Sequence, residues 1–549
     1  MSVASRALPW LTSAAAVLLA AAAGWENSAT TDEPYHLLAS YAHVVEGKAD
    51  LNSDKPPLTK LLAGLALAPL HLRGTEHPPV ARLASLPEET RRFLYQNTRP
   101  PRTILAAARA PQLLFLVALL WGVHLWGREL WGAEGALLAL VAVAAQPLLL
   151  GHAPLVQTDV AAAGAFLWAL YALHRWVRGR EQGWIVFGLL LGLALIAKFS
   201  CLWLIPVGLL LLLLESGRAE IAGRLLRFAF ACALAILVAL AGYAPALRHT
   251  TPPEEDGTIT VVAAQWPGTE RAARALRRLA LVSPAAAHYG LGLLHVYETD
   301  RRGQGINYFL GKTTREGSWL YFPVALLVKL TVPFLALLVL TAVAKGRRWT
   351  RPDAFLLVPA GLTLLVAVGA RYNIGARHVL PIVPLLALFG GQLAGRLLPP
   401  LRAALLVSFA VPPLLFFPHY ISHFNLLAGG PDGGARILTD SNLDWGQDWL
   451  RLAERARREG WTPMTYVYVG TAFPGYDLVG ARDFVNDPAP PSPGFYAVSS
   501  FAERVGPDYL AYLGAGDRAA LLRWLLAHLG AKSRVVGRVG TTITVRELR

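Results

Sequence analysis

Long apolar runs separated by short polar segments dominate residues 1–420 of the chain. A bilayer core of about 30 Å needs about 20 apolar residues per helix, so each long run predicts a membrane-spanning helix. The pattern predicts about eleven such helices, at residues 7–24, 103–126, 134–150, 156–176, 183–198, 200–215, 222–244, 319–343, 354–370, 378–395 and 402–418.

The charges in the short connections predict how these helices are oriented. If the N-terminus lies in the cytoplasm, the arginine-rich connections all face the cytoplasm, as the positive-inside rule requires. They contain Arg128, Arg175, Arg178, Arg180, Arg218, Arg224, Lys345, Arg347, Arg348, Arg351, Arg396 and Arg402. The short connections on the other side contain Lys198, Arg371 and Arg377. An odd number of helices then places the C-terminus outside the cytoplasm.

Two long segments, residues 25–102 and 245–318, fall on the outer side in this topology. Within the first, the apolar stretch 57–72 is short for a span and predicts an interfacial helix that lies along the membrane. The second begins with a Pro/Glu/Asp-rich stretch and predicts helices that lie over the outer face of the bundle.

The composition changes near residue 420, and residues 421–549 predict a small soluble α/β domain outside the membrane. Its apolar runs are short and bounded by Gly and Pro, as is typical of strands. The predicted elements are a helix at Trp445–Arg458, strands at Thr465–Val469 and Phe495–Ser499, a helix at Ala519–His528 and a strand at Thr541–Val545. The predicted fold class is therefore mainly α, a polytopic transmembrane bundle (residues 1–420) with this domain attached.

Composition agrees with a membrane protein, because only 16% of the 549 residues are charged and 54% are hydrophobic. Soluble proteins carry about 25% charged residues. The net charge of +15 is best explained by orientation signals and anionic lipid head groups. The basic residues do not interleave with aromatic ones as nucleic-acid stacking platforms do, so nucleic acid is excluded as a partner.

Cys201 and Cys232 both lie in apolar runs, which excludes a disulfide framework. The N-terminal run, which follows Arg6 and ends at Ala23, is interpreted as an uncleaved first transmembrane helix. Signal-peptide cleavage at Ala21-x-Ala23 is the alternative.

Asp32 and Glu33 are adjacent carboxylates directly after the first apolar run. One interpretation is structural, since Asp32 is suited to cap a helix that begins near Pro34. Ionisable residues at a membrane face are costly to keep there, however, and usually serve a function. We therefore expect these acids, with Tyr35 beside them, to belong to a catalytic site.

Asp54-Lys55-Pro56-Pro57 is the second polar motif of the outer segment. The two prolines form a rigid turn and can start a helix, which gives a structural interpretation with a local ion pair. The functional interpretation places Lys55 against a lipid phosphate at head-group level, because lysine is a compact point charge.

Three further polar positions interrupt apolar sequence. Asp159 opens the fourth span and is either a simple helix cap or a site residue. Lys198 lies between two apolar runs and needs a partner, either an acid or a phosphate. The loop 371–381 contains Arg377 and His378; arginine recognises phosphate through its planar fork, and head-group anchoring is the alternative.

The run from Asp440 to Asp448 is polar, acidic and rich in capping residues. It is suited to bind a sugar, an acceptor or a cation, and equally to cap and dock the first helix of the soluble domain.

At these residues the chain resembles the GT-C type of membrane glycosyltransferase. The branch it resembles is family 39-like and contains protein O-mannosyltransferases and bacterial aminoarabinose transferases. The resemblance rests on Asp32-Glu33, Lys55-Pro56-Pro57-Leu58, Asp159 and Arg377-His378-Val379-Leu380-Pro381, and it covers about residues 1–420.

The resemblance implies transfer of a sugar from a polyprenyl-phosphate donor, with inversion, at the outer face of a bacterial inner membrane. It implies that Asp32 is the general base, that Glu33 orients the site and that Asp159 positions the acceptor or the base. Lys55, Arg377 and Lys198 would hold the donor phosphate, and Tyr35 and His378 would also contact substrate. Some relatives bind a divalent metal through an acid at the position of Asp54 and others need no metal, so the resemblance leaves the metal open.

A site that contains one general base and several cations suits the chemistry of a polyprenyl-phosphate donor. A lipid phosphate is already a good leaving group, so the site needs a base and cationic stabilisation of the departing phosphate. A glycosidase needs two carboxylates that flank the bond. A transporter or flippase of lipid-linked saccharides is the alternative function, and a cell-envelope scaffold with a degenerate site is a third. The acceptor, whether protein, lipid or glycan, stays open.

Overall fold

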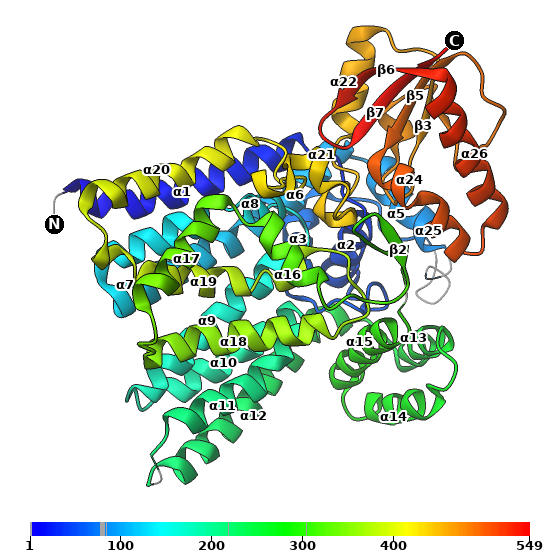
Figure 1. The fold of residues 1–549 in the computed structure, drawn as a ribbon. Coiled ribbons are helices and arrows are strands. Elements are labelled where there is room, and N and C mark those ends of the chain that lie inside the picture. The colour runs from blue at the N-terminus through cyan, green and yellow to red at the C-terminus, as the bar shows by residue number, and fades with distance from the viewer. Residues whose placement is uncertain (1–2, 77–82, 84, 218, 304) are drawn as a thin grey trace.

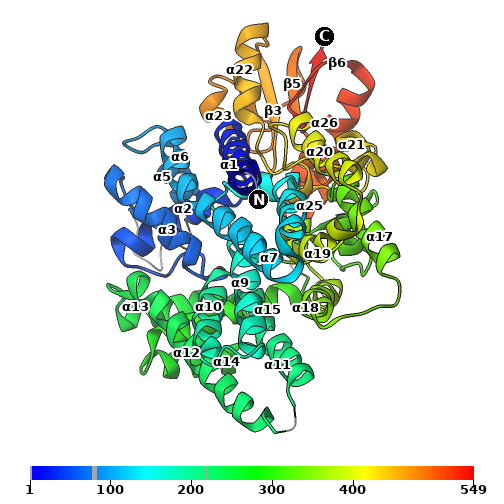
Figure 2. The ribbon, with the colours of Figure 1, turned by 90° about the vertical axis from the view of Figure 1, so that its left-hand side faces the viewer.

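The computed structural model describes residues 3–76, 83, 85–217, 219–303 and 305–549. Residues 77–82 and 84 of the first outer segment, and Arg218 of the predicted orientation signals, lie outside these described residues. The molecule has two parts, a large helical bundle and a small α/β domain at one end of it (Figure 1). Seen from the side, α11 and α12 lie at the opposite end from that domain (Figure 2).

Each predicted span is found as a helix or as a pair of helices. They are α1 (Val3–Glu26), α6 (Pro101–Arg109), α7 (Leu113–Ala144), α8 (Pro147–His152), α9 (Asp159–Val177), α10 (Gly183–Ala197), α11 (Leu204–Glu215), α12 (Ile221–Leu247), α16 (Tyr321–Lys329), α17 (Val332–Lys345), α18 (Arg351–Val368), α19 (Ile382–Gly391) and α20 (Pro399–Leu415). The predicted helical bundle is therefore confirmed.

The chain reverses direction inside α7, at Gly132. Its backbone angles there, φ 70° and ψ −169°, are not helical. A Cβ atom on Gly127 would lie 2.9 Å from the Cα of Ala136, whereas residues nine apart in a straight helix are separated by about 13 Å. The two halves of α7 thus pack side by side, which agrees with the separate spans predicted at 103–126 and 134–150.

The number of full-length spans is smaller than predicted. Five helices of the described chain are long and apolar enough to cross a membrane, if the folded-back stretch Pro101–Ala144 is counted once, or six if the bent pair α16 and α17 counts as one span. The shorter apolar helices include α10, α11, α19 and α20, with 10–17 residues. A 15-residue helix rises about 22 Å, less than a bilayer core. The largest difference is at the predicted span 378–395, where α19 is shortened because 3-10 turns at Ala376–Val379 and Ala394–Arg396 flank it.

Both long segments, residues 25–102 and 245–318, are mainly helical where the structure describes them. The first contains α2 (Glu33–Tyr41), the π-helix η1 (Ala42–Glu46), α3 (Leu58–Leu67), η2 (Ala68–Leu70) and α5 (Leu86–Tyr95). The second contains α13 (Pro252–Ala264), α14 (Glu270–Ala280), α15 (Pro284–Arg301) and the hairpin of β1 (Asn307–Phe309) and β2 (Lys312–Thr314). The second segment packs on the first, because a Cβ on Gly292 of α15 would lie 2.4 Å from the carbonyl oxygen of Ser53.

The C-terminal domain is a five-stranded sheet with helices on both faces. The strand order is β4-β3-β5-β7-β6, in which β3 is parallel to β4 and β5, and β7 is antiparallel to β5 and β6. Trp449 and Leu452 of α22 pack on one face, and Leu522 and Leu525 of α26 pack on the other. The elements are α22 (Trp449–Glu459), β3 (Met464–Val467), α23 (Pro474–Asp477), β4 (Arg482–Asp483), β5 (Gly494–Ser499), α24 (Ser500–Arg504), α25 (Gly506–Tyr512), α26 (Gly516–Lys532), β6 (Ser533–Val539) and β7 (Ile543–Leu548).

A connecting segment, residues 416–448, joins the two parts; residues 438–448 are almost entirely buried, whereas Leu426, Leu427 and Asp432 are exposed. It contains η7 (Leu426–Ala428), α21 (Gly430–Gly434) and η8 (Asp440–Asn442). Lys329, fully buried at the end of α16, donates hydrogen bonds to the carbonyl oxygens of Ile421 (2.9 Å) and Asn442 (2.6 Å). The side-chain amide of Asn425 donates to two carbonyl oxygens at the break between α16 and α17. The turn at 440–442 is therefore held against the membrane helices.

Candidate active site

Asp32 and Glu33 are neighbours in sequence but have different surroundings. The Glu33 side chain is fully buried, and its two oxygens accept from Arg109 Nε (2.9 Å) and Nη2 (2.5 Å). They also accept from the backbone N–H groups of Thr30 and Val156. Burial alone would raise the pKa of Glu33, but Arg109 and these hydrogen bonds lower it below its usual value. Glu33 is therefore a buried, fully paired anion that holds the surrounding backbone in place.

Arg109 uses its remaining donors to fix the chain where it leaves α1. It bonds the carbonyl oxygens of Gly24, Asn27 and Ser28 at 2.6–2.9 Å. The ion pair thus holds the loop that carries Asp32. Sequence reasoning did not single out Arg109, although an arginine inside the predicted apolar span 103–126 was a usable signal.

Glu33→Gln is expected to destabilise the protein by about 3–5 kcal/mol, because it leaves the buried guanidinium of Arg109 without a counter-charge. Thermal unfolding of the purified protein in detergent measures the effect. The control is Glu88→Gln, whose exposed ion pair with Arg91 should contribute less than about 1 kcal/mol. Equal, small changes in both variants would contradict the anchoring role.

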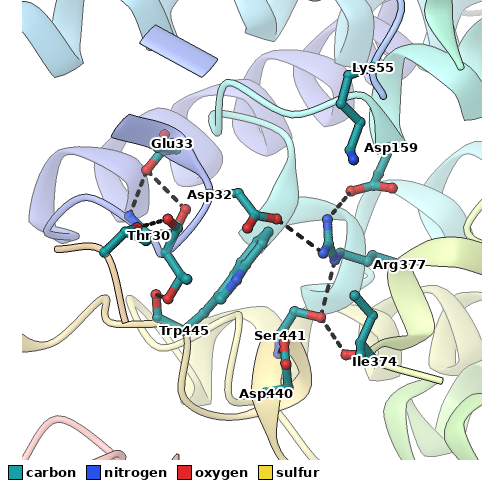
Figure 3. Close-up of polar contacts among 12 residues, drawn as sticks. Thr30, Asp32, Glu33, Lys55, Asp159, Ile374, Arg377, Asp440, Ser441 and Trp445 are labelled. Carbon is teal, nitrogen blue, oxygen red and sulfur yellow. Dashed lines mark hydrogen bonds and ion pairs between the residues drawn. The ribbon is translucent and has the colours of Figure 1, made fainter. Parts of the chain in front are cut away.

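Asp32 occupies the cap position of α2, yet within the described residues its side chain makes no capping hydrogen bond. Instead, its carboxylate accepts from Arg377 Nη2 at 3.3 Å (Figure 3). Its side chain is 36% exposed, compared with 1% for Asp159 on the same arginine. Asp32 is thus the more accessible of these two acids.

Arg377 is the centre of the cluster. It lies in the short helix η5 (Ala376–Val379) before α19, and its side chain is 5% exposed. Nη1 donates to Asp159 (3.2 Å), Nη2 to Asp32 and Nε to Ser441 Oγ (3.1 Å). Its guanidinium lies 4.3 Å from the ring centroid of Trp445. Three of the five N–H donors of the guanidinium are therefore engaged, and two remain.

Asp159 and Lys198 form the second ion pair of the cluster. Lys198 Nζ lies 2.6 Å from Asp159 Oδ1, and Arg377 bonds the other oxygen. Asp159 is the first residue of α9, and Lys198 lies at the break after α10. The partner that Lys198 was predicted to need is therefore Asp159.

Lys55 points toward the same space as Asp159 and Arg377 (Figure 3). It forms an ion pair with Asp54, and its side chain is 29% exposed. Lys60, buried in α3, donates to the carbonyl oxygens of Asn52 (2.9 Å) and Lys55 (2.8 Å). Burial lowers the pKa of Lys60 to about 7. Lys60 thus fixes the turn that presents Lys55.

The fit of a metal at Asp54 is poor. No group of three or more His, Cys, Asp or Glu side chains in the described parts of the chain is placed to hold one. The carboxylate of Asp54 already accepts from Lys55 and, at 3.1 Å, from the Asn52 side chain. We derive no step through a metal.

Tyr35 and His378, the other predicted contacts, lie on segments that border this cluster. Tyr35 is half-buried in α2, and burial, together with Tyr509 and Asp32, raises its pKa to about 12. His378 follows Arg377 directly, and none of the described residues bonds its buried Nε2.

The connecting segment completes the cluster from the C-terminal side. The backbone N–H of Thr31 donates to the carbonyl oxygen of Trp445 (2.9 Å), and that of Ser28 to Gln447 (3.0 Å). These bonds join the loop before Asp32 to the loop after Asp440. The Asp440–Asp448 run combines the two roles predicted for it: its first residues lie beside the Arg377 cluster, and Asp448 at its end is the cap residue of α22, which begins at Trp449.

Asp440 lies beside the cluster, and the pKa of its carboxyl group is raised. Burial, with the nearby charges of Asp32 and Asp444, raises its pKa to about 7, despite the opposing effect of Arg377. A carboxyl whose pKa is higher in the folded than in the unfolded state binds more protons when folded, so folding stability falls as pH rises between the two pKa values.

Asp440→Asn should therefore stabilise the protein in a pH-dependent manner. The gain is expected to be absent below about pH 4, to grow as the pH rises to 7 and to level off at up to about 4 kcal/mol. Melting temperatures of both proteins from pH 4 to 8 provide the measurement. A difference independent of pH would contradict the shifted pKa.

An apolar cavity of about 420 Å³ lies next to Arg109, and neither Asp32 nor Arg377 lines it. It lies between α1 and α6 and is lined by residues including Ala21, Trp25, Leu105 and Leu113. The cavity and the Asp32–Arg377 cluster are therefore separate features.

Comparison with known proteins agrees with this architecture. Residues 104–247 match the family model described as dolichyl-phosphate-mannose-protein mannosyltransferase. No curated protein sequence matches the chain.

Among solved structures, apo ArnT from Cupriavidus metallidurans superposes with a TM-score of 0.50 at 14% identity, over 98% of this chain and 97% of that chain. ArnT bound to undecaprenyl phosphate gives 0.47 at 14% identity, with the same coverage. The apo oligosaccharyltransferase of Archaeoglobus fulgidus gives 0.46 at 12% identity, over 94% of this chain and 73% of that chain.

The matched segment, the shared fold and the helices suited to cross a membrane together confirm the resemblance predicted from the motifs. Residues 104–247 therefore resemble the protein mannosyltransferase family, and the chain as a whole shares the fold of ArnT.

Proposed function

We propose that the protein transfers a sugar from a polyprenyl-phosphate donor to a hydroxyl or phosphate acceptor, with inversion, at the outer face of a bacterial inner membrane. The observation that carries the proposal is the cluster in which one accessible carboxylate, Asp32, lies beside the cations Arg377 and Lys55. The matched family model, named for a dolichyl-phosphate sugar donor, supports the choice of donor.

In the proposed reaction, Asp32 accepts the proton of the acceptor hydroxyl as that oxygen attacks the anomeric carbon. The bond between this carbon and the phosphate oxygen breaks, and the polyprenyl phosphate leaves. Preorganised cations stabilise the charge that develops on a leaving group. Lys55 and the two remaining N–H groups of Arg377 supply them.

Asp159, Lys198 and Glu33 act indirectly in this proposal, by positioning Arg377 and Asp32. Asp159 and Lys198 neutralise each other and hold Arg377, so that its guanidinium stays in one orientation. Glu33 holds the loop of Asp32 through Arg109. An ion pair that is buried must be complete, because a lone buried charge is strongly destabilising.

The flippase alternative has one feature in its favour, the 109° break between α16 and α17, since transporters use broken helices. The lysine at this break, Lys329, is bonded to two carbonyl oxygens of the connecting segment. We interpret the break as the docking point of that segment, and we retain the transferase.

Asp32→Asn is expected to lower transfer at least 100-fold, because general-base catalysis contributes about 10²–10⁴-fold. Donor binding should persist. The measurement is transfer of radiolabelled sugar from undecaprenyl-phosphate donors to membrane extracts, beside a binding assay with the same donors. Asp432→Asn, an exposed acid on α21, is the control; full activity of Asp32→Asn would refute the base assignment.

Lys55→Ala should weaken the binding of undecaprenyl phosphate by about tenfold or more, the effect of one hydrogen bond to a charged group. Titration of the protein in nanodiscs measures it. Lys48→Ala is the matched control, since Lys48 lies on the same outer segment and pairs with Glu254. Unchanged affinity in Lys55→Ala would remove Lys55 from the phosphate site.

A further inference from the structure

The turn Asp440–Asn442 brings a second carboxylate to the site from the C-terminal side. Asp440 adopts a positive φ of 58°, a region that Asp and Asn tolerate better than most residues. One of its carboxylate oxygens accepts from the N–H of Ser441 (2.5 Å). No hydrogen bond from the described residues reaches the other oxygen, so Asp440 keeps an unused acceptor.

Ser441 and Asn442 hold this turn without the Asp440 side chain. Ser441 Oγ accepts from Arg377 Nε and donates to the carbonyl oxygen of Ile374 (2.8 Å). The Asn442 side chain accepts from the N–H of Ala376 (2.9 Å) and donates to the hydroxyl of Tyr321 (3.0 Å). The anchoring contacts of the turn therefore explain Ser441 and Asn442, and they leave the carboxylate of Asp440 unexplained.

Gly375 shows how closely the turn approaches the Arg377 loop. A Cβ on Gly375 would lie 2.2 Å from Ser441 Oγ, so only glycine allows this contact. The side chain of Ser441, the neighbour of Asp440, therefore packs directly against the Gly375 backbone, two residues before Arg377.

Three half-buried tyrosines lie on separate segments, within the electrostatic reach of the two acids. Tyr35 is on α2, Tyr372 is on the loop before η5, and Tyr509 is on α25. The pKa of each is raised by burial and then by nearby groups that include Asp32, and Asp440 acts on Tyr372 and Tyr509. No described residue forms a hydrogen bond with their hydroxyls, which leaves them available to a ligand.

The helix that carries Tyr509, α25, is connected to other segments through the neighbouring residue, Asp508. Asp508, the neighbour of Tyr509, accepts a hydrogen bond from Thr313 Oγ1 of β2 (2.5 Å) and pairs with Arg523 of α26. The α/β domain, which carries Tyr509, is thus hydrogen-bonded to the second outer segment.

We propose that Asp440, together with Tyr35, Tyr372 and Tyr509, forms a subsite that binds the hydroxyls of an uncharged sugar ring on the donor. The proposal rests on the proposed function, because Lys55 and Arg377 then take the phosphate and this subsite takes the sugar. A carboxylate with a free oxygen accepts from sugar hydroxyls, and tyrosine hydroxyls both donate and accept. In its ionised form, above the raised pKa, the same carboxylate repels a sugar acid.

The test compares donors with and without a sugar on the full chain in nanodiscs. The probes are undecaprenyl phosphate alone and the same lipid bearing mannose, glucose or glucuronic acid. The wild-type protein should bind at least one neutral hexose donor about tenfold or more tighter than the bare lipid phosphate, and the glucuronic acid donor more weakly than that hexose donor.

Asp440→Asn should lose most of the affinity gained from the sugar, roughly 10-fold or more for a hydrogen bond to a charged group, and keep its affinity for bare undecaprenyl phosphate within twofold. Tyr509→Phe should lose part of the gain. Asp432→Asn is the control and should behave as wild type. The melting temperature, expected to be unchanged or higher for Asp440→Asn, verifies that the variant folds.

Three results would overturn the subsite. The first is a wild-type protein that binds bare and hexose-bearing lipid phosphate equally. The second is an Asp440→Asn variant that weakens both ligands alike, which would assign Asp440 to the phosphate site through Arg377. The third is a variant that weakens neither. A wild-type protein that binds no polyprenyl phosphate at all would instead overturn the proposed function.

Discussion

The site depends on one buried guanidinium that joins three distant parts of the chain. Arg377 bonds Asp32 from the first outer segment, Asp159 from the start of α9 and Ser441 from the connecting segment. A buried cation is stable only when it is paired and its donors are satisfied. Folding of the bundle and docking of the connecting segment must therefore both be complete before the arginine is satisfied. The same interaction leaves Asp32 beside it accessible to solvent.

A second buried ion pair has a different task. Glu33 and Arg109 are closed to solvent and bond four backbone positions near the end of α1 between them. The two adjacent acids thus have different roles. Glu33 fixes the loop that carries Asp32, and Asp32 faces the cations Arg377 and Lys55. This division follows from burial, because a fully paired carboxylate has no oxygen left for a substrate proton. It also explains why an exposed acid and a buried acid stand side by side at the end of a membrane helix.

Much of this arrangement could be predicted from the sequence. Apolar runs predicted the helices, and acids or lysines at their ends predicted Asp32, Lys55, Asp159 and Lys198 as site candidates, because charge is rare in such sequence. The length of the helix predicted at 378–395 was overestimated, since the 3-10 turns that flank α19 contain apolar residues that continue its apolar run. The edge strand β6 was not predicted, because its partly exposed pattern lacks the alternation of a half-buried strand.

Long-range partners could not be predicted, because pairing across hundreds of residues leaves no periodic signal. Nothing local indicates that Ser441 bonds Arg377, or that Trp445 packs its ring on that guanidinium. The sequence therefore could not decide whether the Asp440–Asp448 run caps a helix or belongs to the site. Asp444 and Asp448 accept backbone N–H groups within the C-terminal part, whereas the turn of Asp440 faces the cluster.

The central claim is that a lipid phosphate binds between Lys55 and Arg377 with Asp32 beside it. The most direct measurement is an electron cryo-microscopy structure of the protein with undecaprenyl phosphate in nanodiscs. The account predicts phosphate density within hydrogen-bond distance of Lys55 Nζ and on the side of Arg377 that faces Asp32. Phosphate density elsewhere, such as beside Arg102 at the apolar cavity between α1 and α6, with the Lys55–Arg377 space unoccupied, would contradict it.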